Sequence, residues 1–194
     1  MFLIPAPFRV VLDANVLFPF TVRDTLLRAA EQDLYLPGWT DGILEEMRRN
    51  LVARGHTRED QSHRLVATIA AAFPEARITG HDCLIPCMPN EPEDRHVAAA
   101  AVRSAAQLIV TGNLRHFRSL PDGIEARTAE DFLCDLHDLA PDRMAQVIAD
   151  QAAALTRPPR TVDDILRAFD RLTPRFARLV RATRATQAGG LASG

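Results

Sequence analysis

Apolar positions along the chain follow two spacings, which predict strands alternating with helices. Residues 8–13 contain a short, unbroken apolar run, as in a buried strand, and two further strands are predicted over 34–36 and 108–111. Between these runs, apolar residues recur at helical spacing, which predicts helices over 20–32, 41–53, 58–73 and 93–106. This alternation indicates an α/β fold, with a parallel β-sheet flanked by helices.

The later part of the chain is mostly helical by the same criterion. Residues 76–92 hold short strand-like pieces among four prolines and glycines, so strand and loop are expected there. Thr128 is placed to cap a helix, and beyond Pro141 the spacing predicts helices over 142–155, 162–172 and 174–186. We therefore expect a domain of residues 1–139, a helical C-terminal extension of residues 140–188 and a disordered tail of residues 189–194.

The composition, with 47% hydrophobic and 25% charged residues, is typical of a soluble globular protein. No run approaches the roughly 20 apolar residues of a membrane span, and the N-terminal segment lacks the pattern of a signal peptide. We therefore expect a cytoplasmic protein that does not enter a membrane. Its three cysteines are an odd number, which argues against a disulfide framework.

The basic residues exclude several kinds of chemistry. All 23 are arginines, so a P-loop, a Schiff base and a lysine general base are impossible. The charge is also uneven, because residues 1–156 carry 15 Arg against 22 Asp and Glu, whereas residues 157–194 carry 8 Arg against 3 Asp. A basic C-terminal segment can bind nucleic acid or an acidic partner, and it can equally be a solvated helix face.

Acidic and amide side chains recur where this fold would bring them together. Asp13 ends the first predicted strand, and ligands in open α/β sheets bind beyond the carboxyl ends of strands. Thr111 and Asn113 come at the end of a later strand, and two predicted helices carry the other candidates, Glu45, Glu46, Glu93 and Asp94. Clustered carboxylates repel one another until a cation binds, and Mg²⁺ prefers a few such ligands together with water. The pattern favours a metal-dependent nuclease.

Each of these residues also has an ordinary structural explanation. Asp13 can cap a helix or form a turn, and a pair of glutamates on a helix is usually solvated. Glu93 and Asp94 can serve only the helix dipole, an effect of roughly 0.3–1 kcal/mol each. Asn113 can be a turn former. The joint occurrence of all these residues favours the metal site over the separate explanations.

Four segments together resemble the PIN-domain ribonucleases, especially the VapC-type toxins of bacterial toxin–antitoxin pairs. In chain order they are Val11–Leu17 (VLDANVL), Ile43–Met47 (ILEEM), Pro92–Ala100 (PEDRHVAAA) and Ile109–Phe117 (IVTGNLRHF). The first segment alone is weak, but the order and spacing of all four, within residues 8–138, are specific. The helical end resembles the C-terminal extension of one branch of this family.

The resemblance implies an acidic Mg²⁺ or Mn²⁺ site at the rim of the parallel sheet. The acids that match the family's catalytic metal ligands are Asp13, Glu46 and Asp94. The weaker acidic candidates are Glu45 and Glu93, and the matching polar positions are Asn15, Thr111 and Asn113. Asn113 departs from the aspartate of much of the wider family. An amide oxygen brings no charge, so we expect one tightly bound metal, with Asn113 as a neutral ligand.

The same resemblance implies an RNA substrate, a cognate antitoxin protein as partner and a homodimer. Arg95 and Arg115 lie beside site residues and could bind phosphate, although such arginines are more often surface ion-pair residues. The alternative function is that of a catalytically inactive PIN-like protein, which acts as an interaction or RNA-binding module.

Other site chemistries fit this sequence less well. A haloacid-dehalogenase-like phosphatase would need Asp in place of Asn15 and usually a downstream lysine, and a receiver domain fails similarly. A zinc site of unfamiliar spacing can be drawn from His81, Cys83, Cys87, Cys134 and His137. Buried cysteines without a metal are common, and Cys83 lies in an apolar strand-like piece.

Overall fold

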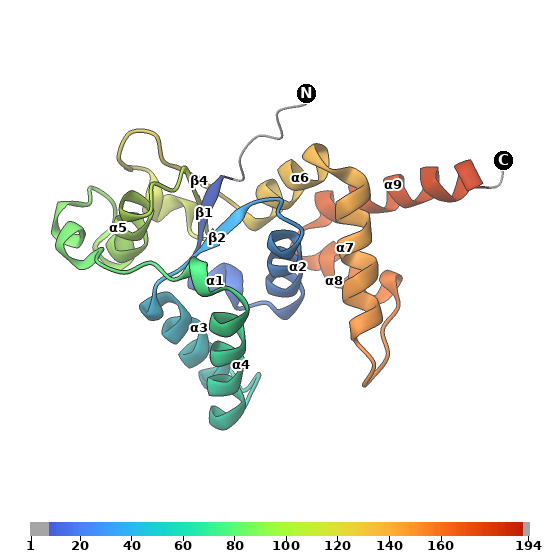
Figure 1. Ribbon diagram of the computed structural model, residues 1–194, viewed down its shortest axis with the longest axis horizontal. Helices are drawn as coiled ribbons and strands as arrows, with labels where there is room; N and C mark the ends of the chain where they lie inside the picture. The colour runs from blue at the N-terminus through green and yellow to red at the C-terminus, as the bar shows by residue number, and fades with distance from the viewer. Residues whose placement is uncertain (1–7, 192–194) are drawn as a thin grey trace. The chain divides into compact units, whose positions relative to one another are not determined.

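The computed structural model describes residues 8–191 of the chain (Figure 1). These residues divide into two compact units. The first consists of residues 8–19 and 35–128, and the second consists of residues 20–34 and 129–191. The chain therefore leaves the first unit to form one helix of the second, returns, and then leaves again after Thr128.

A four-stranded parallel sheet lies at the centre of the first unit. The strands are β1 (Arg9–Leu12), β2 (Leu36–Gly38), β3 (Leu108–Val110) and β4 (Glu125–Arg127), in the order β2-β1-β3-β4. The side chains from Val10 to Leu12 are fully buried because β1 is an inner strand with parallel neighbours on both sides. In this register Val11 lies opposite Gly38 and Ile109. The predicted parallel sheet flanked by helices is confirmed.

The helices of the first unit are α1 (Ala14–Leu17), α3 (Asp41–Ala53), α4 (Glu59–Ala72) and α5 (Arg95–Arg103). The Thr40 hydroxyl caps α3 by accepting a hydrogen bond from the Ile43 N–H at 3.1 Å. Alanine-rich α5 packs on β1 and β3, and α3 lies beside α4 (Figure 1). Four short 3₁₀ helices connect these elements: η1 (Pro74–Ala76), η2 (Asp82–Cys87), η3 (Pro92–Asp94) and η4 (Leu114–Phe117).

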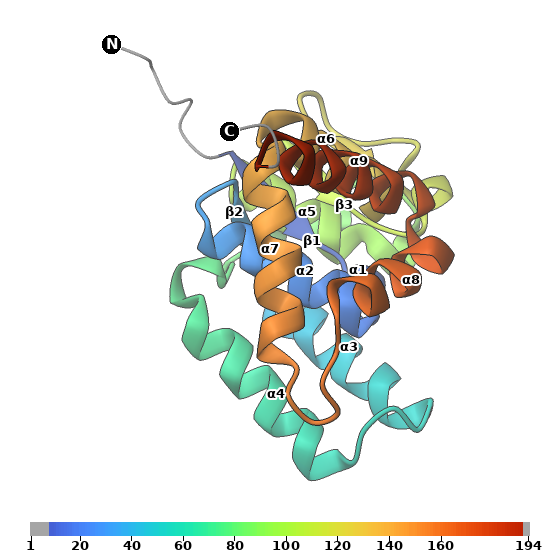
Figure 2. The same cartoon turned by 90° about the vertical axis from the view of Figure 1, so that its right-hand side faces the viewer.

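The described part of the second unit is built of helices joined by turns and loops. It contains α2 (Phe20–Glu31), α6 (Ala129–Leu139), α7 (Pro141–Ala154), α8 (Val162–Leu172) and α9 (Pro174–Leu191), and Figure 2 shows α7 running beside α2. A buried hydrogen bond joins α2 to α7, because the Thr25 hydroxyl donates to Gln151 Oε1 at 2.7 Å. Between α8 and α9, the rings of Phe169 and Phe176 pack edge to face, with 5.1 Å between the ring centroids. None of the helices within residues 8–191 is both long and apolar enough to cross a membrane.

The structure differs from the predicted elements in several places. β2 begins at Leu36, two residues later than the start of the predicted strand over 34–36. Residues 76–92 form turns and 3₁₀ helices instead of strand pieces, except that Arg77 makes an isolated bridge to Trp39. The predicted helix over 93–106 is divided between η3 and α5. β4 was not predicted, because its sequence Glu-Ala-Arg has no apolar run.

The predicted domain boundaries also differ from the bounds of the compact units. The predicted boundary at residue 139 divides the chain into two continuous segments. The compact units instead place α2 and α6 with the C-terminal helices. The apolar face of α2 packs on α7 and α8, which explains its separation from the sheet. α9 continues through Leu191, beyond the expected start of the tail at 189. The rest of that predicted tail, residues 192–194, lies outside the described residues.

Candidate active site

The carboxyl ends of β1 and β3 bring Asp13 and Thr111 together. Each residue directly follows its strand, and the strands pair in parallel, so both residues stand at one edge of the sheet. The Asp13 N–H donates to Val110 O at 3.0 Å, and the Thr111 hydroxyl donates to Asp13 Oδ2 at 2.7 Å. Asp13 is only 2% exposed. An acidic side chain is thus buried at the edge where open α/β sheets bind their ligands.

Asn15, in the first turn of α1, completes the arrangement around Asp13. Its amide nitrogen donates to Asp13 Oδ2 at 2.6 Å and to Thr111 Oγ1 at 3.3 Å. Its carbonyl oxygen accepts from the Gly112 N–H at 2.7 Å, while the Asn113 N–H donates to Thr111 Oγ1 at 3.0 Å. The donors and acceptors of Asn15 and the Thr111 hydroxyl therefore all have partners. The result is a fixed carboxylate, because both side-chain donors bind the same oxygen of Asp13.

The electrostatic surroundings oppose ionisation of two carboxyl groups in this region. Burial raises the pKa of Asp13, and the charge of Asp94 raises it further, although the hydrogen bond from Thr111 acts in the opposite direction. Glu46 lies half-buried on α3, and burial raises its pKa as well. The charges of Asp13 and Asp94 also raise the pKa of Glu46, which His96 partly offsets. Asp13, Glu46 and Asp94 are therefore close enough to repel one another.

Asp94 comes to this region from η3, just before α5, and a histidine holds its carboxylate. His116 Nδ1 lies 2.6 Å from Asp94 Oδ2, and both side chains are mostly buried. Arg115 Nε donates to His116 Nε2 at 3.1 Å, so this ring nitrogen accepts. In a neutral imidazole the other nitrogen then carries the proton, which makes Nδ1 the donor to Asp94. In the bond between these two side chains, His116 is thus the donor and the Asp94 carboxylate is the acceptor.

The weaker acidic candidates stand apart from this group. Glu45 is exposed, and Arg48 donates to both of its carboxylate oxygens at 2.7 Å. This pairing with Arg48 lowers the pKa of Glu45, the opposite of the shift at its neighbour Glu46. Glu93 is also exposed, and its backbone carbonyl, rather than its carboxylate, contacts His96 Nδ1 at 3.0 Å. Of the two glutamates in α3, the structure brings only Glu46 to the other acids.

Asn113 contributes to the site through its backbone. The N–H of Asn113 binds Thr111 Oγ1, while its side chain is exposed. Its role as a neutral metal ligand therefore stays a prediction, since the hydrogen bond of its backbone already explains its place in the turn.

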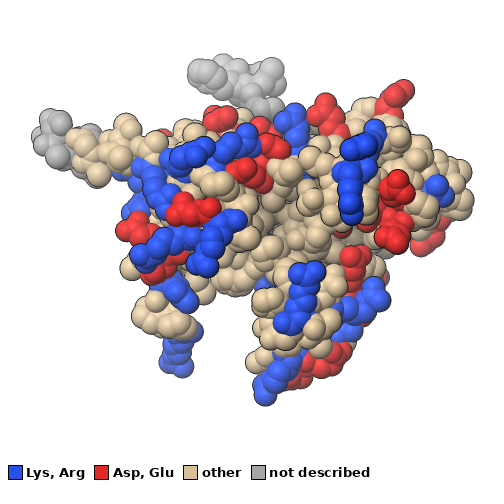
Figure 3. Space-filling view, turned by 180° about the vertical axis from the view of Figure 1, so that it is seen from behind, with Lys and Arg blue, Asp and Glu red and all other residues tan. Residues whose placement is uncertain are grey.

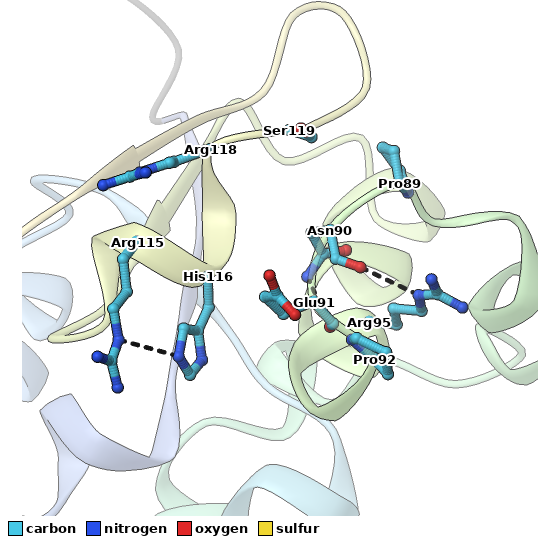
Figure 4. Close-up of a pocket in the computed structure, with 9 residues that line it drawn as sticks. All are labelled: Pro89, Asn90, Glu91, Pro92, Arg95, Arg115, His116, Arg118 and Ser119. Atoms are coloured by element: carbon cyan, nitrogen blue, oxygen red, sulfur yellow. Dashed lines mark hydrogen bonds between the residues drawn. The ribbon is translucent and has the colours of Figure 1, made fainter.

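Arg95 and Arg115 line a pocket next to Asp94. This pocket has a volume of about 390 Å³ and lies between residues 89–95 and residues 115–119 (Figure 4). Arg95 Nε donates to Asn90 O at 3.1 Å. Figure 4 shows the guanidinium groups of Arg95 and Arg115 on opposite sides of the pocket, with His116 beside Arg115. The two arginines therefore do not converge on one point of the pocket.

The acidic residues can be tested for their fit to a cation. All three carboxylates offer hard oxygen ligands, and their mutual repulsion would be relieved by a bound cation. Within residues 8–191, no three His, Cys, Asp or Glu side chains lie close enough to surround a single ion. Mg²⁺ usually retains several waters and takes only one or two carboxylates directly. The donor chemistry therefore fits a hydrated Mg²⁺ or Mn²⁺ ion.

Two histidines in this region were missed in the sequence. His116 contacts Asp94, and His96 affects the pKa of Glu46. Both lie inside segments that carry the family resemblance, three residues after Asn113 and two residues after Asp94. That proximity was the available signal, but contact between residues 94 and 116 depends on how η3 and η4 approach each other. The cysteines of the possible zinc site do not lie in a buried strand, because Cys83 and Cys87 are exposed in η2.

Comparisons with known proteins agree with the order of these segments. Residues 9–115 match the PIN domain family, and residues 129–182 match the VapC50 C-terminal domain. A curated relative from Mycobacterium tuberculosis (strain ATCC 25618 / H37Rv), named "Putative ribonuclease VapC50", is 41% identical over 105 residues. That alignment covers 53% of this chain and 62% of the relative, so it spans somewhat less than two thirds of the relative's length. No solved structure matches this chain.

Proposed function

The chain belongs to the PIN domain family, and from this premise we propose that it is a metal-dependent endoribonuclease. The observation that carries the proposal is the buried Asp13 carboxylate at the edge of the sheet, which Thr111 and Asn15 hold through Oδ2 and whose charge acts together with those of Asp94 and Glu46. Repulsion among these charges costs stability, and a binding site for a divalent cation explains why a protein would retain it.

The residues around the acids support this role. Thr111 and Asn15 orient Asp13 through its Oδ2 atom, and His116 orients Asp94. With Glu46, these acids would hold a hydrated Mg²⁺ or Mn²⁺ ion, one or two of them directly and the rest through its waters. The ion would supply an activated water and neutralise charge at a phosphodiester. Arg95 and Arg115 line the pocket that also contains His116, the partner of Asp94, and would attract the phosphates of RNA. The hydrogen bonds to Asp13 and Asp94 fix these two carboxylates before the substrate arrives.

The name of the curated relative and the match to the VapC50 C-terminal domain support a more specific proposal. In this proposal the chain is the toxin of a toxin–antitoxin pair, is bound by a cognate antitoxin protein, forms a homodimer and acts in the cytoplasm. Co-expression with the product of a neighbouring reading frame tests the pairing. The expected result is a stable complex that no longer cleaves RNA, and a neighbouring product that neither binds nor inhibits would contradict the pairing.

Cleavage of total cellular RNA by the purified protein tests the main proposal. With Mg²⁺ or Mn²⁺ the RNA is expected to yield discrete fragments, and with a chelator it is expected to remain intact. Folded protein that neither cleaves RNA nor binds Mn²⁺ would overturn the proposal. The chain would then be assigned to the alternative, a metal-free PIN-like interaction module.

Substitution of His116 separates positioning of Asp94 from general packing. The amide nitrogen of asparagine can occupy the place of His116 Nδ1, whereas that of glutamine reaches the place of Nε2. His116→Gln is therefore expected to weaken Mn²⁺ binding by about 10–100-fold, as for other groups that orient metal ligands, and His116→Asn is expected to retain most of it. Calorimetric Mn²⁺ titration of both variants measures the difference, and equal affinities would contradict the role.

A further inference from the structure

A second pocket, in the helical unit, has a composition unlike that of the acidic site. Its volume is about 460 Å³, and it is formed by the start of α2, the segment between α7 and α8, and one face of α8. Apolar side chains, including Leu155 and Ile165, form part of the wall. Nothing in the proposed chemistry at Asp13 uses this pocket. Its size is that of an ordinary small-ligand site.

The pocket carries an excess of positive charge. Four arginines line it, against one carboxylate: Arg157, Arg160, Arg167, Arg171 and the acid Asp164. Arg167 forms an ion pair with Asp164, which also accepts hydrogen bonds from Thr161. The other three arginines are exposed, and within residues 8–191 none of them has a carboxylate partner. Figure 3 shows basic side chains at the tip of the projection that joins α7 to α8.

An exposed aromatic ring lies in the same pocket. Phe20, the first residue of α2, is 48% exposed, although the other large aromatic residues of this unit are buried. The guanidinium of Arg23 lies 5.8 Å from the centre of the Phe20 ring. An exposed phenylalanine costs solvation free energy in the free protein, and this cost is recovered when a flat ligand covers the ring. The ring therefore marks a place for a planar group beside the arginines.

From these contacts we propose that the pocket binds single-stranded RNA, with one base stacked on Phe20 and the flanking phosphates paired with Arg157, Arg160 and Arg171. Proteins that bind single strands combine an aromatic stacking surface with a basic groove in this way. The arginines match phosphates by charge, and the ring matches a base; single-stranded RNA supplies both in every nucleotide. The proposal rests on the proposed function only in naming RNA as the ligand.

Fluorescence anisotropy of a labelled oligouridine, in buffer with chelator, tests the site on the full chain. Phe20→Ala is expected to raise the Kd at least about fivefold, the lower end for loss of one stacked base. The double variant R157Q/R160Q is expected to weaken binding and to make the dependence of log K on log salt less steep. The magnitude of the negative slope is expected to fall by about 1.4, since each single-strand phosphate contributes roughly 0.7. A matched control is R143Q/R178Q, which removes two exposed arginines from the same unit but outside the pocket.

The outcomes distinguish this site from the proposed function. Loss of affinity in the pocket variants, but not in R143Q/R178Q, supports the site whether or not the protein cleaves RNA. Unchanged affinity and salt slope in both pocket variants overturn the site, even if cleavage by the wild type continues. If those variants instead lose binding of poly-glutamate, the pocket takes an acidic protein segment and the RNA proposal is wrong. Equal losses in the pocket and control variants also overturn it, because they indicate general charge attraction.

Discussion

Asp13→Asn is expected to reduce metal-dependent RNA cleavage by roughly 10³-fold or more while leaving the fold intact. The buried Asp13 carboxylate supplies a charge that asparagine lacks. The amide oxygen of asparagine can still accept the hydrogen bonds from Thr111 and Asn15, so the turn after β3 keeps its anchor. A single-turnover cleavage assay at saturating Mn²⁺, with circular dichroism of both proteins, measures the effect. Cleavage by the folded variant at near wild-type rate would remove Asp13 from the proposed site.

The same substitution is expected to stabilise the metal-free protein at neutral pH. Burial raises the folded-state pKa of Asp13, with a further contribution from the Asp94 charge, so the folded state binds this proton more tightly than the unfolded state. For an acid shifted in this direction, folding stability is lost as the pH rises from the ordinary pKa through the raised one. Asparagine avoids that loss, and a gain of about 1 kcal/mol would raise the Tm by roughly 2–4 °C.

Melting curves in chelator at several pH values test this second effect. The Tm difference between Asp13→Asn and the wild type is expected to grow as the pH rises above the acidic range and to reverse when Mn²⁺ stabilises only the wild type. A Tm difference that shrinks with rising pH would contradict the expectation that the ionised Asp13 carboxylate destabilises the metal-free fold.

Glu46→Gln is expected to reduce cleavage by about 10²–10³-fold, whereas Glu45→Gln is expected to change it by less than about twofold. The two residues are neighbours on α3, with the same chemistry, but they have different surroundings. The charges of Asp13 and Asp94 act on Glu46, while Glu45 is exposed and paired with Arg48. Loss of an exposed ion pair costs little, because water screens it.

This pair of variants controls for helix stability, since both replace glutamate by glutamine one position apart. Cleavage rates and Mn²⁺ affinities are compared at the same metal concentration. Equal losses would indicate that α3 responds as a whole, and a larger loss for Glu45→Gln would exchange the roles of the two glutamates.

The strand over residues 9–12 and the residues that follow it could be predicted because their signal is local. A buried parallel strand needs a continuous apolar run, and Val10–Leu12 supplies one. Asp13 and Thr111 were placed at one edge by the same logic, since each ends a predicted strand of a parallel sheet. β4 and η2, the 3₁₀ helix between residues 76 and 92, escaped prediction. An edge strand of polar residues has no apolar pattern, and in η2 the apolar residues around Pro86 suggested short strands.

For the candidate site, too, the residue types could be predicted from the sequence, but the contacts between distant segments could not. The residue types and their order along the chain marked the acids as candidates, and the family resemblance selected Asp13, Glu46 and Asp94 among them before any geometry was known. The contact between His116 and Asp94 was not evident, because it joins side chains 22 positions apart through two short 3₁₀ helices. The pocket beside Phe20 was equally hidden, since it combines the start of α2 with residues far along the chain.

By itself, the sequence determined the elements with strong periodicity, the exclusion of lysine chemistry and the set of acids to consider, because these depend on residue type and local spacing. Only the tertiary structure decided what holds the carboxylates of Asp13 and Asp94, how differently Glu45 and Glu46 are surrounded, and which helices share a unit with α2. Those properties depend on distances between segments remote in the chain. Such distances are set by packing of the whole unit, and a one-dimensional pattern carries no record of them.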